Sequence, residues 1–149
     1  MAKETKEIKL LGFNFTRIDA RKFNFQRNIG AKSDIKIDSI EKSRLDLLNE
    51  DALKFGFSFE INYGEVGDIL IEGFMVLKLD SKAHKEVLSM WKDKKIPQGI
   101  RLVVLNIVLQ KCSLKSLQLE EELGLPFHMR MPSFQPSPES EKSGKSKQK

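Results

Sequence analysis

The apolar stretch 97–112 constrains the fold more than any other part of the chain. Eight of the ten positions in 100–109 are apolar, and only Arg101 and Asn106 interrupt them. A helix on the surface of a globular domain needs one apolar stripe, about three or four positions per two turns. This helix is apolar most of the way round, so it requires cover on two sides. We expect a small sheet to cover one side and a second subunit to cover the other.

Other structures remain open for the same stretch. Valine and isoleucine favour strands, so a central strand of a parallel sheet is an alternative, although the stretch exceeds the usual strand length of about four to eight residues. Pro97 favours a helix, since a proline at a helix start loses no hydrogen bond. A membrane span needs about 20 apolar residues. The stretch is shorter and has charged flanks, so we expect no membrane insertion.

The composition fits one soluble domain with a mild basic bias. With 149 residues, 40% of them apolar, the chain can bury a core. Lysine and arginine outnumber the acids by 26 to 21, which is less than the dense positive surface of a dedicated nucleic-acid-binding protein. The single cysteine, Cys112, excludes an internal disulfide framework. The N-terminus lacks an apolar run typical of a signal peptide, so we expect a cytoplasmic protein.

Alternating apolar residues predict an antiparallel sheet. The strongest pattern spans 53–63, where every odd position is apolar and the even positions are polar or glycine. A glycine-bearing loop at 64–68 leads to a returning strand at 69–79. A third strand is expected at 34–40. Near the N-terminus, the alternation of a phenylalanine pair at 13–15 is interrupted at 16–20 and resumes with a second pair at 23–25, which indicates either one long strand with a bulge or two short strands.

The remaining segments surround the predicted sheet and helix. We expect a turn at 28–33, a loop at the end of 43–51, and a modest helix at 82–95 capped by Asp80 or Ser81. A leucine pattern follows the apolar stretch and stops at Gly124 and Pro126. The expected organisation is a charged lead at 1–11, an α+β domain at 12–135 and a disordered Lys- and Ser-rich tail at 136–149.

The sequence contains no catalytic constellation that we can identify, and we expect no enzyme activity and no cofactor. His84, His128 and Cys112 have no metal-ligand spacing, and glycine-rich residues 64–67 lack the lysine and helix of a phosphate loop. The run Glu120–Glu122 is interpreted as a solvated helix face, because consecutive residues point in different directions.

Apolar residues on the second face of the sheet are the feature most relevant to function. Leu70, Phe74 and Val76 share this face with charged residues of the returning strand. Either the loop at 43–52 or a neighbouring subunit covers them, or they form an exposed apolar groove for a nonpolar, extended ligand.

Several short segments resemble the SecB-type export chaperones. The junction Ile96–Arg101, IPQGIR, is similar to the start of the long SecB helix, and Lys111–Ser113 to its basic end. Leu125-Pro126 and Met131–Phe134 are similar to the proline-bearing tail. The opening GFNFTRIDARKFNF is similar to the first, broken strand of that fold.

The resemblance implies a four-stranded antiparallel sheet with a long apolar helix packed on one face. It also implies a homo-oligomer, a dimer or tetramer, and an ATP-independent holdase that binds unfolded polypeptide clients, either for protein export or for a toxin–antitoxin system. The candidate polypeptide-binding residues are Phe23, Phe25, Leu70, Phe74, Val76 and Trp91. The candidate oligomer interface consists of Leu102, Val104, Leu105 and Val108.

The chain departs from the SecB pattern in two respects. SecB proteins dock the motor SecA through an acidic sheet surface, whereas this chain is basic, which argues against SecA as a partner. The second helix that follows the tail in SecB is replaced by a charged segment.

Two alternative functions remain open. In the first, the protein is a small ribosome- or RNA-associated protein, in which Arg21, Lys22, Phe23, Phe25 and Arg27 combine phosphate binding with base stacking. In the second, it is a purely structural subunit whose apolar faces are all used in oligomer contacts.

Overall fold

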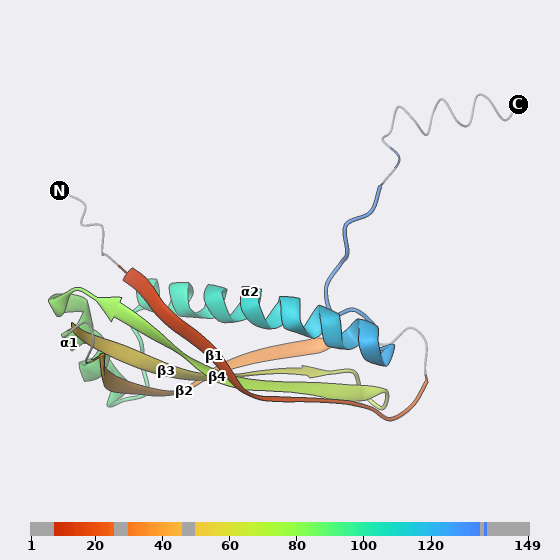
Figure 1. The fold of residues 1–149 in the computed structure, drawn as a ribbon, viewed down its shortest axis with the longest axis horizontal. Coiled ribbons are helices and arrows are strands. Elements are labelled where there is room, and N and C mark those ends of the chain that lie inside the picture. The colour runs from red at the N-terminus through yellow and green to blue at the C-terminus, as the bar shows by residue number, and fades with distance from the viewer. Residues whose placement is uncertain (1–7, 26–29, 46–49, 135, 137–149) are drawn as a thin grey trace, which may run out of the picture.

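The computed structural model describes residues 8–25, 30–45, 50–134 and 136. It has the predicted α+β fold, a four-stranded antiparallel sheet with a long helix along one face (Figure 1). The elements, in chain order, are β1 (Ile8–Lys22), β2 (Lys32–Leu45), β3 (Glu50–Asn62), β4 (Gly67–Leu79), α1 (Ser81–Trp91) and α2 (Gln98–Leu123). The strands lie in the order β1-β4-β3-β2, so β1 and β2 form the two edges of the sheet.

The predicted alternation of β3 and β4 sorts their side chains onto two faces. Phe55, Phe57 and Phe59 are fully buried on the face that α2 covers. Across the hairpin they pair with Met75, Gly73 and Ile71, which continue the same apolar layer because paired residues share a face. The odd-numbered side chains of both strands thus form the core, and the even-numbered ones point away from α2.

Strand β1 is one long strand with irregularities, the first of the two expected alternatives. Its register shifts between Phe15 and Arg17, so that Phe13 pairs with Met75 but Ile18 pairs with Ile71. Because of this bulge, the side chains on the core face are odd-numbered before it, as at Phe13, and even-numbered after it, as at Ile18. The strand begins before the expected start at residue 12. It ends at Lys22, so the second phenylalanine pair, at 23 and 25, lies beyond it.

The segments around the sheet match the predictions in part. Asp80 caps α1 by accepting a hydrogen bond from the backbone N–H of Ala83, at 2.8 Å. Strand β2 runs past residue 40 to Leu45, into the segment expected to lead into a loop. Of the loop expected at the end of 43–51, residues 50 and 51 belong to β3, and residues 46–49 lie outside the described residues. The first two residues of the expected turn at 28–33 and the tail from 137 onward also lie outside them, and the end of that turn belongs to β2, which begins at Lys32.

Helix α2 is longer than the apolar stretch from which it was predicted. It continues through the leucine pattern to Leu123 and ends at Gly124, whose φ of 72° is the left-handed conformation that favours glycine. By length and composition this helix could cross a membrane, which corrects the expectation that it is too short. The core helix of a soluble protein meets the same criterion, and α2 packs on the sheet.

The buried positions of α2 follow a regular spacing. Its fully or nearly fully buried residues recur every fourth position, with one addition at Ser113; they are Ile100, Val104, Val108, Cys112, Ser116 and Glu120. The opposite side carries apolar residues that the sheet leaves exposed, including Leu102, Leu109 and Leu114, of which Leu114 is 67% exposed. One chain therefore covers only one side of this helix.

Two of the four predicted oligomer-interface residues are placed elsewhere by this packing. Val104 and Val108 are completely buried against the sheet of their own chain, so a second subunit cannot reach them. Periodicity in a helix that is apolar all round does not tell which side meets the sheet. Leu102 is 52% exposed and remains a candidate for an intersubunit contact, whereas Leu105 is half-buried and lines the groove described below.

Candidate functional site

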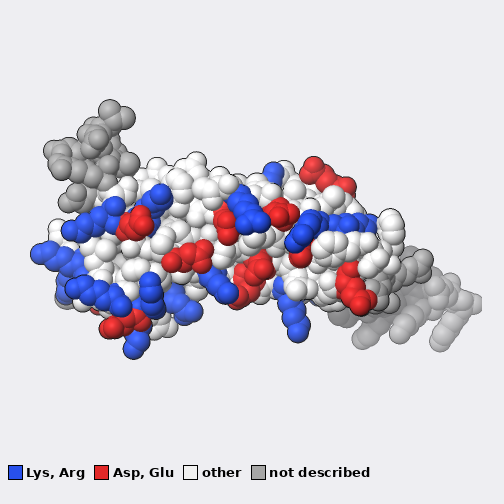
Figure 2. All heavy atoms as spheres, turned by 90° about the horizontal axis from the view of Figure 1, so that it is seen from below, with Lys and Arg blue, Asp and Glu red and all other residues white. Residues whose placement is uncertain are grey.

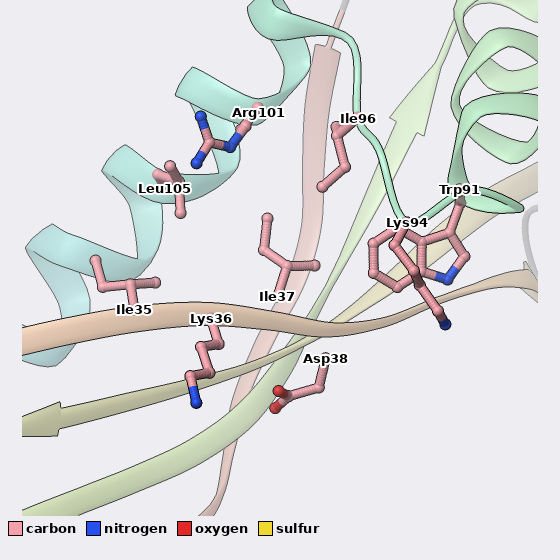
Figure 3. A pocket seen from close by; sticks show the side chains of 9 residues that line it. All are labelled: Ile35, Lys36, Ile37, Asp38, Trp91, Lys94, Ile96, Arg101 and Leu105. Carbon is pink, nitrogen blue, oxygen red and sulfur yellow. The ribbon is translucent and has the colours of Figure 1, made fainter.

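A groove of about 450 Å³, which we call the β2 groove, lies between the N-terminal half of α2 and the edge strand β2 (Figure 3). Its apolar lining comes from three separate parts of the chain, namely β2, the end of α1 with the following connection, and α2; these residues are Ile35, Ile37, Trp91, Ile96 and Leu105. Four charged residues also line it: Lys36, Asp38, Lys94 and Arg101.

The sequence explains why an apolar groove forms here. Ile35 and Ile37 pair with Phe59 and Phe57, so they extend the apolar layer of the core to the edge of the sheet. A single helix does not cover a four-stranded sheet to both edges, and both isoleucines remain partly exposed. Figure 3 shows these isoleucines on the same side of β2 as Leu105 of α2.

The strand beside the groove is open to a further strand. Among the described strands, β2 pairs only with β3, so the backbone groups on its other edge are available. An extended peptide recognises such an edge by main-chain hydrogen bonds, while neighbouring pockets receive its alternate side chains. The open edge of β2 and the adjacent apolar groove together have the geometry of a site for an extended polypeptide.

The structure distributes the predicted polypeptide-binding residues over three places. Trp91 lines the β2 groove. Phe25, which is 90% exposed, lines a second hollow with Lys22, Val66 and the segment after α2. Phe23 directly follows β1 and is also exposed. The other three predicted residues, Leu70, Phe74 and Val76, lie on the sheet face away from α2. The sequence prediction therefore does not describe a single site.

The face away from α2 is less apolar than the sequence prediction implied. Val76 is buried, and Lys54 places its Nζ 4.3 Å from the centre of the Phe74 ring. Figure 2 shows this face with lysine and arginine intermingled with aspartate and glutamate. An ordinary charged surface thus covers part of the expected groove, and Lys54, the side chain over Phe74, comes from β3.

Arg21, which was proposed for RNA binding, and the nearby Arg17 on the same strand are paired with acids. Arg21 lies 3.5 Å from Asp68 and 3.8 Å from Asp19, and Arg17 lies 3.9 Å from Glu72. These exposed pairs contribute little stability, but they neutralise part of the local positive charge. Arg27 lies outside the described residues. RNA binding stays a prediction, which salt dependence tests below.

A buried polar cluster lies at the C-terminal end of α2, where the sequence predicted a solvated face. Glu120 is 0% exposed, and its Oε2 accepts a hydrogen bond from the Tyr63 hydroxyl. The same oxygen lies 2.9 Å from Nδ1 of His128 and accepts from the His128 backbone N–H at 3.1 Å. Burial, followed by the hydrogen bond and the charge of Glu120, raises the pKa of Tyr63.

This cluster has the features of a structural joint. It fixes the segment that follows α2 to both the helix and the end of β3. Among the described residues, no group of three or more histidine, cysteine, aspartate or glutamate side chains could hold a metal ion. The every-fourth-residue burial pattern of α2, continued from Ile100, reaches Glu120, but this pattern is known only from the packing of the helix on the sheet.

No protein-family model and no curated protein matches the chain. One solved structure that is similar is a SecB-like chaperone of Mycobacterium tuberculosis in complex with a ChAD peptide from the HigA1 antitoxin. The two share 12% sequence identity with a TM-score of 0.47, and the match covers 87% of this chain and 93% of the other. The chain is similar to a SecB-like chaperone. This is the same family that its short motifs resemble.

Proposed function

We propose that the protein is an ATP-independent holdase that binds non-native polypeptides in extended form along the β2 edge. The observation that carries this proposal is the apolar groove that lies open beside an unpaired strand edge. Holding a chain in this way requires apolar surface and backbone pairing, and no bond is made or broken. The motif resemblance to SecB-type chaperones supports the same function, which serves either protein export or a toxin–antitoxin system.

The proposal includes association of two or more copies through α2. Its outer side exposes Leu102, Leu109 and Leu114, and the apolar side of a long helix gains free energy when it leaves water, by roughly 25 cal/mol per Å². The β2 groove lies at the edge of the sheet, beside this outer side of the helix. Oligomer contact and client binding therefore use different surfaces of the same chain.

Suppression of aggregation tests the holdase function. A chemically denatured substrate is diluted into buffer that contains either the parent protein or the Leu105→Gln variant. Aggregation of the substrate is followed by light scattering. We expect the parent protein to suppress scattering at near-stoichiometric ratio, and the variant to lose most of this effect because a polar amide enters the groove. Leu10→Gln is the matched control, since Leu10 is exposed on β1 and lies outside both the groove and α2.

Three results of this experiment have distinct meanings. Equal activity of parent and Leu105→Gln would contradict the β2 groove as the binding site. Loss of activity in Phe74→Ser but not in Leu105→Gln would place the site on the opposite sheet face. Inactivity of the parent, with RNA binding that falls steeply as salt increases, would support the RNA-associated alternative.

A further inference from the structure

The charged residues of the β2 groove are arranged unequally about its apolar floor. Arg101 projects from α2 over Leu105, toward the same side of β2 as Ile35 and Ile37 (Figure 3). In the same view Asp38, the only acid of the lining, points away from α2 on the other side of the strand. The apolar side of the groove therefore contains a guanidinium group and no carboxylate from the lining.

The guanidinium of Arg101 has no ionic or hydrogen-bonded partner within the described part of the chain. This sets it apart from Arg17 and Arg21, which lie within 4 Å of acidic side chains. A guanidinium binds a carboxylate through two parallel hydrogen bonds, and beside apolar side chains such a pair is screened less than in open water.

The start of α2 adds to the positive potential of this wall. Pro97 precedes the helix and provides no side-chain hydrogen bond to the first-turn N–H groups. Unpaired N–H groups at a helix N-terminus carry partial positive charge and favour an anion nearby. Ile96, immediately before Pro97, lines the groove, so the helix start lies next to the site.

Lys94 and Lys36 complete a lining of three cations against one acid. Lys94 lies with its Nζ 4.7 Å from the centre of the Trp91 ring, at the rim of the apolar surface. An added strand next to β2 would place alternate side chains near the apolar floor and Arg101, and the intervening ones near Lys36.

We infer that the groove selects extended polypeptide segments that combine apolar residues at alternate positions with an acidic side chain, which Arg101 binds. This inference rests on the proposed function and specifies its client class. The apolar side chains fill the space between Ile37 and Leu105, and the client carboxylate pairs with the guanidinium. A segment with lysine in place of the acid meets a positively charged wall and binds less well.

Three fluorescent peptides of one length test this selectivity. They carry the same apolar residues at alternate positions, with glutamate, glutamine or lysine at one further position of the same alternation, which faces Arg101, and both ends are blocked so that no terminal carboxylate takes part. Binding is measured by fluorescence anisotropy at low and at physiological salt. We expect the glutamate peptide to bind about tenfold more tightly than the lysine peptide at low salt, with a smaller difference at higher salt.

Substitution of the arginine identifies the group responsible. Arg101→Gln should remove most of the difference between the glutamate and lysine peptides, and Arg101→Glu should reverse it. Arg130→Gln is the control, since Arg130 is exposed and lies outside the groove. Melting temperatures of all variants should match the parent, because Arg101 is exposed and makes no side-chain contact that folding requires.

The outcomes separate the selectivity from the holdase function. Equal binding of all three peptides by a protein that suppresses aggregation would overturn the acidic selectivity and leave the holdase function standing. An unchanged preference in Arg101→Gln would overturn the role of Arg101. Failure of every peptide to bind, with no suppression of aggregation, would overturn both proposals.

Discussion

The carboxylate of Glu120 contacts His128 twice, once through the backbone N–H at 3.1 Å and once through Nδ1 at 2.9 Å. Both contacts use Oε2, which also accepts from the Tyr63 hydroxyl. The last turn of α2, the end of the β3–β4 hairpin and the segment after the helix are thus joined at one oxygen atom. His128 also lies against Phe59, with 6.2 Å between ring centres, so the joint is part of the core.

Removing this acceptor should destabilise the fold. Glu120→Ala leaves the Tyr63 hydroxyl and the His128 N–H without their partner in a buried place, which costs about 1–3 kcal/mol. Urea denaturation followed by circular dichroism measures the loss. Glu121→Ala is the control, because Glu121 is exposed, and its stability should equal that of the parent. Equal stability of the two variants would contradict a structural role for Glu120.

Stability should decrease in alkaline solution. Burial raises the pKa of the Tyr63 hydroxyl above its ordinary value, and raises that of the Cys112 thiol to about 12. The folded state therefore keeps protons that the unfolded chain releases at its ordinary pKa values, about 8.5 for cysteine and 10 for tyrosine. This contribution is complete below pH 8 and is lost progressively as pH rises above these values.

Urea midpoints between pH 7.5 and 11 measure this dependence. Tyr63→Phe and Cys112→Ala should each make the alkaline decline shallower, whatever their effect at neutral pH. A decline with the same slope in the parent and in both variants would show that other groups cause it.

Gly73 should tolerate no side chain. A Cβ atom at this position would overlap the carbonyl oxygen of Asn14 and lie 2.8 Å from the Phe57 ring. Overpacking of this kind costs about 1–3 kcal/mol, so Gly73→Ala should lower the melting temperature by several degrees. Gly12→Ala is the matched control in β1, since nothing lies within 4 Å of its added Cβ. Equal melting temperatures would contradict the close approach of β1 to β4.

Aspartate substitutions on opposite sides of α2 separate folding from assembly. Val104→Asp buries an unpaired charge in the core, so it should unfold or strongly destabilise each chain. Leu102→Asp places the charge on the exposed side, where it should leave the fold intact and break contacts between copies. Multi-angle light scattering at low and high salt measures the mass. A parent protein that is monomeric at micromolar concentration would contradict assembly through α2.

The sheet was predictable because its local pattern and its burial agree. The strict alternation at 53–63 predicted which face of β3 is buried, and Gly124 predicted the end of α2. The irregularity of β1 was visible as an interruption of the alternation at 16–20, but the sequence could not decide between one strand and two. That choice depends on pairing with β4, which is a long-range contact.

The site was less predictable for a physical reason. The groove combines residues from β2, the end of α1 and α2, and only the packing of these elements brings them together. Ile35 and Ile37 looked like ordinary strand residues, and Leu105 was assigned to an oligomer contact. Glu120 was interpreted as solvated, because three consecutive glutamates do not reveal which one faces the sheet.

The spacing of the buried residues along α2 has a geometric consequence for any sister molecule. Residues four apart are separated by about 400° of helical rotation, so the line of contact with the sheet advances by about 40° at each step. From Ile100 to Glu120 it travels roughly halfway round the rod. The uncovered side spirals by the same amount. A parallel α2 helix from a second copy would lose contact with this uncovered stripe after a few turns. The two helices must therefore cross at an angle to stay in contact along it.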